Sequence, residues 1–174
     1  SNIHLIGRLD KETSGILGIA KNSVTAERMI KQRQSGILIK EYYALVKGNP
    51  PEEGVLEIPM EEMRDAQDGD KLKMKVGQGE NAKMAKTFFR VIKRFEKFSL
   101  VSLVIETGRT HQIRFHMASI GCPLLGDFFY GDGPELGISR TALHARRLTF
   151  THPFCEKVMR IESEMPKDLS FLLR

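Results

Sequence analysis

The sequence is poor in cysteine and has no tryptophan. Its 174 residues include two cysteines, Cys122 and Cys155, too few for a disulfide framework or a four-cysteine metal site. It has no run of about 18 apolar residues, so we expect neither a membrane-spanning helix nor a membrane partner. Near the N-terminus no basic segment precedes an apolar run, so we expect no signal peptide. These absences favour a reducing, cytoplasmic compartment.

Charge is present in both signs but is unevenly distributed along the chain. Lys and Arg number 27 and Asp and Glu number 22, which gives a formal net charge of +5. Residues 1–50 carry +4 and residues 83–160 carry +7, whereas residues 51–82 carry −5. If the two basic blocks meet in the fold, they form a face suited to a polyanion. The alternative is an ordinary solvated surface of lysines.

The order of the elements predicts an α+β fold with a mixed, mainly antiparallel sheet flanked by short helices, built as a single domain over residues 1–174. Strands are expected over 16–20, 38–46, 72–76, 87–95, 99–106, 143–150 and 157–162. Helices are expected from Val24 to before Gly36 with Asn22 or Ser23 as N-cap, over 110–120 with Thr110 as N-cap, and over 166–173. Residues 61–82 are expected to be a long loop with one short strand.

The first candidate for chemistry is Asp10, in the segment Gly7-Arg8-Leu9-Asp10-Lys11-Glu12-Thr13-Ser14-Gly15. Thr, Ser and Gly after the aspartate are common in tight turns. Such a loop can present Asp10 as a partly desolvated carboxylate that acts as a nucleophile or general base. In the alternative, Asp10 only bonds the backbone of its own turn.

The second candidate is the segment 107–116, in which a glycine is followed at once by a predicted helix. The N-terminus of a helix favours anions, so Arg109 is placed to bind a phosphate. Thr110 and Arg114 are four residues apart and would share a helix face, and Arg114 can pair with a buried carboxylate. The alternative is a surface helix with two solvated arginines. His111 and His116 are five apart and do not share a face, so we expect no metal site.

The third candidate is the segment Lys40-Glu41-Tyr42-Tyr43-Ala44-Leu45-Val46. Alternation along a strand puts Tyr42 and Tyr43 on opposite faces, so one phenol can line a cleft while the other packs or meets solvent. A core tyrosine is the commoner case.

Together these segments resemble the RluA-type pseudouridine synthases. Residues 7–15 look like the family's catalytic-aspartate loop, and residues 40–46 look like its Lys-x-Tyr-x-Ala-x-Val strand. Residues 107–127 look like its third motif, and Leu143-His144-Ala145 with His152-Pro153 looks like its late motif. The motifs occur in the family's order over residues 7–153.

The resemblance implies an RNA partner and an enzyme that isomerises uridine in ribosomal or transfer RNA without any cofactor. Asp10 matches the catalytic aspartate, Arg114 the arginine that pairs with it, and Tyr42 the tyrosine that stacks on the target base. Arg8 matches the arginine that helps to turn the nucleotide out of its stack. The resemblance also implies RNA contacts from five consecutive residues of the third motif: Arg109, Thr110, His111, Gln112 and Ile113. Asp10 would attack C6 of the base or C1′ of the ribose, or remove a ribose proton; the residues do not choose among these routes.

The chain departs from the family pattern at two places. Position 7 is Gly where the family usually has His. Family members carry about 50 or more residues before the aspartate loop, often with an S4 RNA-binding domain that is not found here, so we expect a fragment or a short member.

Two rival functions remain open. The first is a catalytically silent RNA-binding or ribosome-assembly protein of the same fold, and the second is a small-molecule enzyme that uses Asp10 and His111 as a pair of bases. The RNA, the uridine and the oligomeric state are not fixed by the sequence, although we expect a monomer.

Overall fold

The chain divides into two compact units, and one strand passes from the first into the second. The computed structural model describes residues 2–65 and 71–174. Unit 1 comprises the residues up to Tyr43 together with Leu143–Arg174, and unit 2 comprises Ala44–Ala142. Strand β4 (Ile39–Lys47) begins in unit 1 and ends in unit 2. The single domain expected over 1–174 stays a prediction.

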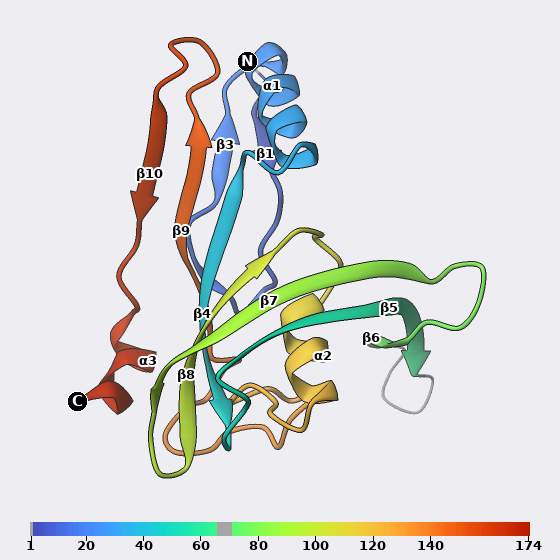
Figure 1. Ribbon diagram of the computed structural model, residues 1–174, viewed down its shortest axis with the longest axis vertical. Helices are drawn as coiled ribbons and strands as arrows, with labels where there is room; N and C mark the ends of the chain where they lie inside the picture. The colour runs from blue at the N-terminus through green and yellow to red at the C-terminus, as the bar shows by residue number, and fades with distance from the viewer. Residues whose placement is uncertain (1, 66–70) are drawn as a thin grey trace. The chain divides into compact units, whose positions relative to one another are not determined.

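Unit 1 combines strands with helix α1 and a C-terminal helical turn (Figure 1). Its elements besides β4 are β1 (His4–Ile6), β2 (Ser14–Gly15), β3 (Gly18–Ala20), α1 (Ser23–Gln34), β9 (Leu143–Thr151), β10 (Val158–Glu162), α3 (Lys167–Ser170) and a 3-10 turn at Phe171–Leu173. β1 and β3 form an antiparallel pair, and helix α1 packs against both. The larger sheet has the order β10-β9-β4, and β2 pairs with β9 in parallel.

Unit 2 is a sheet with one helix against it. Its elements are the end of β4, β5 (Glu53–Asp65), β6 (Lys71–Val76), β7 (Lys83–Arg94), β8 (Phe98–Ile105) and α2 (Gln112–Ser119). The strand order is β4-β8-β7-β5-β6, and β7 pairs antiparallel with both β5 and β8. Helix α2 packs against β5 and β7 (Figure 1). The α+β class and the mainly antiparallel pairing are as predicted.

Helix α1 begins and ends where the sequence predicts. The Asn22 side chain accepts a hydrogen bond from the Thr25 N–H at 2.8 Å and so caps the helix. Its inward face is narrow, because Ala26 and Met29 are buried whereas Val24 and Ile30 are about half exposed. Polar contacts add to this small apolar contact area: the Gln32 side chain accepts from the N–H of Thr151 in β9 at 2.9 Å and donates to the C=O of Thr151 at 2.6 Å.

Helix α2 begins later than predicted. His111 precedes it with φ +53°, a left-handed conformation, and no side chain caps the helix. Thr110 is therefore neither the N-cap nor a helical residue, so the prediction that it shares a helix face with Arg114 is wrong. Gly121, at φ +77°, follows the helix end as predicted and donates its N–H to the Ala118 carbonyl.

Strand β5 was not predicted, and the expected loop over 61–82 is wrong for residues 61–65. Over residues 53–58, β5 alternates between exposed and partly buried positions, and two of the exposed positions, Glu53 and Glu57, are acidic. Charges on β7 compensate for them: Glu57 pairs with Lys86 at 3.1 Å and Glu53 with Arg90 at 3.0 Å. Part of the basic block over 83–160 is thus neutralised by the acidic segment. Strand β6 matches the short strand expected at 72–76, and residues 66–70 lie outside the described residues.

Candidate active site

The loop that carries Asp10 is fixed to β9 at its C-terminal end. The Asp10 carbonyl accepts from the Thr13 N–H at 3.0 Å, which closes a turn, and Ser14 and Gly15 then pair with His144 and Ala145. The His144 Nε2 lies 3.0 Å from the Ser163 carbonyl and must donate to it, so Nδ1 accepts from the Ser14 hydroxyl at 2.9 Å. Asp10 itself is partly exposed, and Arg8 is exposed on the same loop.

Gly15 is required by this attachment. Its φ is +115°, and a Cβ added there would lie 2.1 Å from the carbonyl oxygen of Ala145. Both the backbone conformation and the close approach of β9 exclude any other residue without a backbone shift.

Tyr42 is buried in unit 1 and lies within the electrostatic reach of Asp10. Its side chain is 5% exposed on β4. Burial and the negative charge of Asp10 raise the pKa of Tyr42 to about 12, and Arg33 opposes this shift. The phenol therefore stays protonated at neutral pH, which favours stacking or hydrogen bonding over action as a free base. Tyr43 faces Arg146, whose guanidinium lies 4.2 Å from the ring centroid, as expected for the opposite face.

Arg114 is held rigidly in unit 2 by a buried carboxylate. Its Nε and Nη2 donate to the two oxygens of Asp127 at 2.7 and 2.8 Å. Asp127 also accepts from the N–H groups of Phe129 and Tyr130. Burial alone would raise the pKa of Asp127, but these bonds and the Arg114 charge outweigh it and hold that pKa below its usual value.

The predicted pairing of Arg114 with a buried carboxylate is confirmed, and its partner Asp127 was missed as a site residue. The sequence offered one signal, since Asp127 closes the third motif. The family-implied pairing of Arg114 with Asp10 joins residues of different units and stays a prediction.

Gln112 is a buried positioning residue. Its side-chain oxygen accepts from the Thr107 hydroxyl and the Arg109 N–H, at 2.7 and 3.1 Å. Its side-chain nitrogen donates to the Lys86 carbonyl and the Thr87 hydroxyl, both at 2.9 Å. All the bonding capacity of the amide is used within the protein, so a direct bond from Gln112 to RNA would have to displace one of these.

The residues on either side of Gln112, His111 and Ile113, are also fixed by contacts within the protein. Ile113 is 4% exposed. The His111 Nδ1 lies 2.9 Å from the hydroxyl of Tyr130, and this hydroxyl accepts a hydrogen bond from the Met74 N–H at 2.8 Å. His111 and Tyr130 thus connect the start of α2 to β6.

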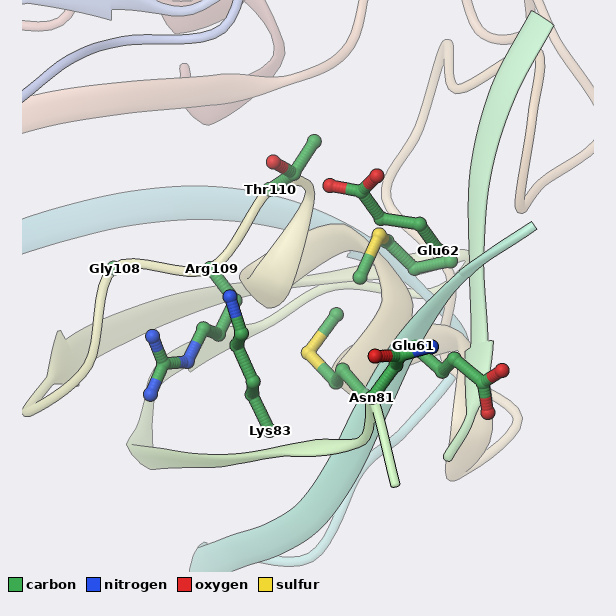
Figure 2. A pocket seen from close by; sticks show the side chains of 9 residues that line it. Glu61, Glu62, Asn81, Lys83, Gly108, Arg109 and Thr110 are labelled. Atoms are coloured by element: carbon green, nitrogen blue, oxygen red, sulfur yellow. The ribbon is translucent and has the colours of Figure 1, made fainter. Parts of the chain in front are cut away.

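A hollow of about 460 Å³ in unit 2 contains Arg109 and Thr110 (Figure 2). Figure 2 shows Lys83 and Arg109 on one side and Glu61 and Glu62 on the other. The buried methionines Met60 and Met74 also line it. Opposite charges balance in this hollow, so it suits a polar, uncharged group better than a phosphate alone. Asp10 and Tyr42 do not line it.

The described residues contain no group of three or more His, Cys, Asp or Glu side chains placed to hold a metal ion. Within the same residues, no helix is long and apolar enough to cross a membrane.

Comparison with known proteins places these motifs in a family. The family described as RNA pseudouridylate synthase matches residues 1–119. An uncharacterized RNA pseudouridine synthase of Chloroflexus aurantiacus is 37% identical over 98% of this chain and 52% of its own length. Ribosomal large subunit pseudouridine synthase D of Nitrosomonas europaea is 36% identical over 98% of this chain and 50% of its own length. The chain thus spans about half the length of the curated relatives it matches.

A solved structure agrees with the sequence relatives. Human RNA pseudouridylate synthase domain containing 4 superposes with a TM-score of 0.79 at 27% identity, covering 98% of this chain and 74% of that one. The identity over nearly the whole chain, the family match and the shared fold lead to one conclusion: this chain belongs to the RluA-type RNA pseudouridine synthase family.

Proposed function

We propose that this chain isomerises uridine to pseudouridine in RNA, with Asp10 as the catalytic carboxylate. The observation that carries the proposal is that Asp10 lies within electrostatic reach of the buried phenol of Tyr42, where its charge, after burial, contributes to raising the Tyr42 pKa to about 12. A carboxylate within reach of a protonated phenol combines a nucleophile or general base with an aromatic ring on which a nucleobase can stack.

The reaction needs no external reactant. The bond between N1 and C1′ breaks, the uracil turns, and C5 bonds to C1′. The C5 proton leaves and N1 gains one, so atoms and charge balance. Asp10 acts first, by attack on C6 or C1′ or by removal of a ribose proton. Tyr42 stacks on the uracil and, as a neutral phenol, can donate a hydrogen bond to it.

Arg114 is the proposed charge partner of Asp10. An adjacent guanidinium would keep the carboxylate ionised and aimed. The rigid clamp of Asp127 supports this role, because an arginine already held by two bonds loses little freedom when substrate binds.

Of the remaining site residues, Arg8, Arg109 and Thr110 are assigned to direct RNA contact. Arg8 is exposed and suited to displacing the target nucleotide, and Arg109 and Thr110 line the hollow of unit 2. His111, Gln112 and Ile113 position this segment from within. Ribosomal RNA is the first substrate to test, because relatives at about 36% identity are named ribosomal large subunit pseudouridine synthases. Transfer RNA is the second. A monomer in the cytoplasm that works without a cofactor stays the prediction.

The proposal is tested by mapping pseudouridine in unmodified ribosomal and transfer RNA transcripts after incubation with this chain. Carbodiimide adducts on pseudouridine stop reverse transcription and locate each modified position. We expect a stop at one or a few uridines. Tight RNA binding without any stop would instead favour the catalytically silent RNA-binding protein.

A further inference from the structure

Gly7 lies against two cations that form no ion pair with an acidic side chain in the described part of the chain. A Cβ added at Gly7 would lie 2.8 Å from the Lys40 Nζ and 3.8 Å from the Arg33 Nη1. Both nitrogens are thus close to one point on the loop, and therefore close to each other. Within residues 2–65 and 71–174, neither Lys40 nor Arg33 forms an ion pair.

This arrangement is costly to the protein on its own. Lys40 is only partly exposed, and burial together with the charge of Arg33 lowers the pKa of Lys40. Arg33 gains some stabilisation from its place in the last turn of α1, where helix carbonyls favour cations. Lys40 lies on a strand and gains nothing comparable. Two like charges held together without a counter-charge are an arrangement that an anion would stabilise.

The cation pair lies next to the proposed reaction centre. Lys40 and Tyr42 are two residues apart on β4, so their side chains leave the same face of the strand, roughly 7 Å apart. The loop from Gly7 to Asp10 follows this face: Gly7 adjoins Lys40, and Asp10 acts on Tyr42. A group bound by Lys40 and Arg33 would thus be about one nucleotide from a base stacked on Tyr42.

We propose that Lys40 and Arg33, at Gly7, bind one backbone phosphate of the RNA strand beside the uridine that stacks on Tyr42. This inference rests on the proposed function and deepens it. A phosphodiester fits because it carries one negative charge and two free oxygens, one for each cation. The absence of a side chain at position 7 leaves the space that the Lys40 ammonium occupies.

The experiment compares one phosphate and one cation at a time. A short RNA containing the mapped uridine is made with a neutral methylphosphonate at each nearby linkage in turn, and its Kd is measured with the parent chain, Lys40→Met and Arg33→Gln. Methionine keeps most of the Lys40 stem and removes its charge. Lys31→Met is the control, because Lys31 lies on α1 and is exposed, and it pairs with Glu27.

One linkage should stand out. Its methylphosphonate weakens binding to the parent and to Lys31→Met about tenfold, but leaves the Kd of Lys40→Met and of Arg33→Gln almost unchanged. With unmodified RNA, either variant should lower the slope of log Kd against log salt by about 0.7, the value for one single-strand phosphate contact. The proposal is overturned if the methylphosphonate at every linkage changes the Kd of the parent and of the variants by the same factor. It is also overturned if Lys40→Met has the parent's slope of log Kd against log salt.

A stability measurement separates binding from a structural role. Removing one of two repelling charges should leave the Tm of Lys40→Met equal to that of the parent or higher. A clear fall in Tm would make Lys40 a structural residue and overturn the proposal.

These readouts do not depend on turnover. If the parent binds RNA with the expected linkage effect but forms no pseudouridine, the phosphate site stands and the proposed function fails. If the parent forms pseudouridine while the variants keep the parent's linkage effects, the phosphate site fails alone.

Discussion

At the scale of single residues, the molecule holds its charges in three different ways. The Arg114–Asp127 pair is buried and bidentate, and the pairs between β5 and β7 are at the surface, whereas Lys40 and Arg33 form no ion pair among the residues that the structure describes. Breaking the buried pair has a large effect because it leaves an uncompensated buried charge, whereas surface pairs are worth about 0–1 kcal/mol.

Replacement of Asp127 should lower the free energy of unfolding more than replacement of a surface carboxylate. Asp127→Asn keeps an acceptor for the Phe129 and Tyr130 N–H groups but leaves Arg114 without its counter-charge, so we expect a loss on the order of 3 kcal/mol in the free energy of unfolding. Urea denaturation measures it. Asp132→Asn, which breaks the exposed pair with Lys47, should cost less than about 1 kcal/mol. Equal losses in the two variants would contradict the assigned role.

Tyr42 should contribute its ring to binding and its hydroxyl to the chemistry. Tyr42→Phe keeps the ring, so its Kd for RNA should stay within about twofold of the parent while turnover falls. Tyr42→Leu should weaken binding by roughly 1–3 kcal/mol, the value of one stacked base. Because the pKa of Tyr42 is about 12, the parent's rate should show no ionisation of this phenol at physiological pH. Equal affinities of the Phe and Leu variants would exclude stacking.

At the scale of elements, the sequence predicted what local patterns determine. The N-cap of α1, strand β4 and the late strands β9 and β10 follow from capping chemistry and alternation, and all are confirmed. Strand β5 was missed because its acidic face is stabilised by Lys86 and Arg90, which lie about 30 residues further along the chain. The start of α2 was wrong because the left-handed His111 depends on tertiary bonds such as that to Tyr130.

The candidate site, like the fold, was predictable in part from the sequence. Motif order pointed to Asp10, Tyr42 and Arg114, whose assignment stays a prediction. The partner Asp127 and the internal role of Gln112 could not be derived, because both depend on side chains that only the fold brings together.

The β2–β9 pairing should be the element that holds the Asp10 loop. Gly15→Ala places a Cβ against the Ala145 carbonyl at 2.1 Å, so we expect detachment of the loop, a loss of at least about 2 kcal/mol in stability and loss of turnover. Gly36→Ala is the matched control: its φ is +74° but nothing lies within 4 Å. It should cost about 1 kcal/mol and leave turnover intact. The idea fails if both glycine variants have the same turnover.

At the scale of the whole molecule, buried titratable groups predict sensitivity to acid. Burial lowers the pKa of His116 from 6.5 to about 4, partly offset by the Ile58 carbonyl. The folded chain therefore keeps His116 neutral while the unfolded chain takes up a proton below pH 6.5, so stability falls as the pH drops from about 6.5 to 4. Asp127 adds a further loss of stability at lower pH. Its pKa is lowered in the folded chain, so its contribution is complete above the pKa of the unfolded carboxyl and is lost as the pH falls below that value.

The predicted change in the free energy of unfolding between about pH 6.5 and 4 is roughly 2–3 kcal/mol from His116. Urea midpoints across this range measure it, and His116→Gln should show a shallower dependence on pH. A parent whose midpoint is flat over the range would contradict this account.

The account depends above all on Asp10, and one measurement tests it directly: release of tritium from C5 of labelled uridine in RNA. The parent chain and Glu12→Gln, which changes another acid of the same loop, should release tritium at comparable rates. Asp10→Asn should bind the RNA with a Kd within about twofold of the parent and release none, since an amide can neither attack nor take a proton. Release by Asp10→Asn at the parent's rate would contradict the central claim.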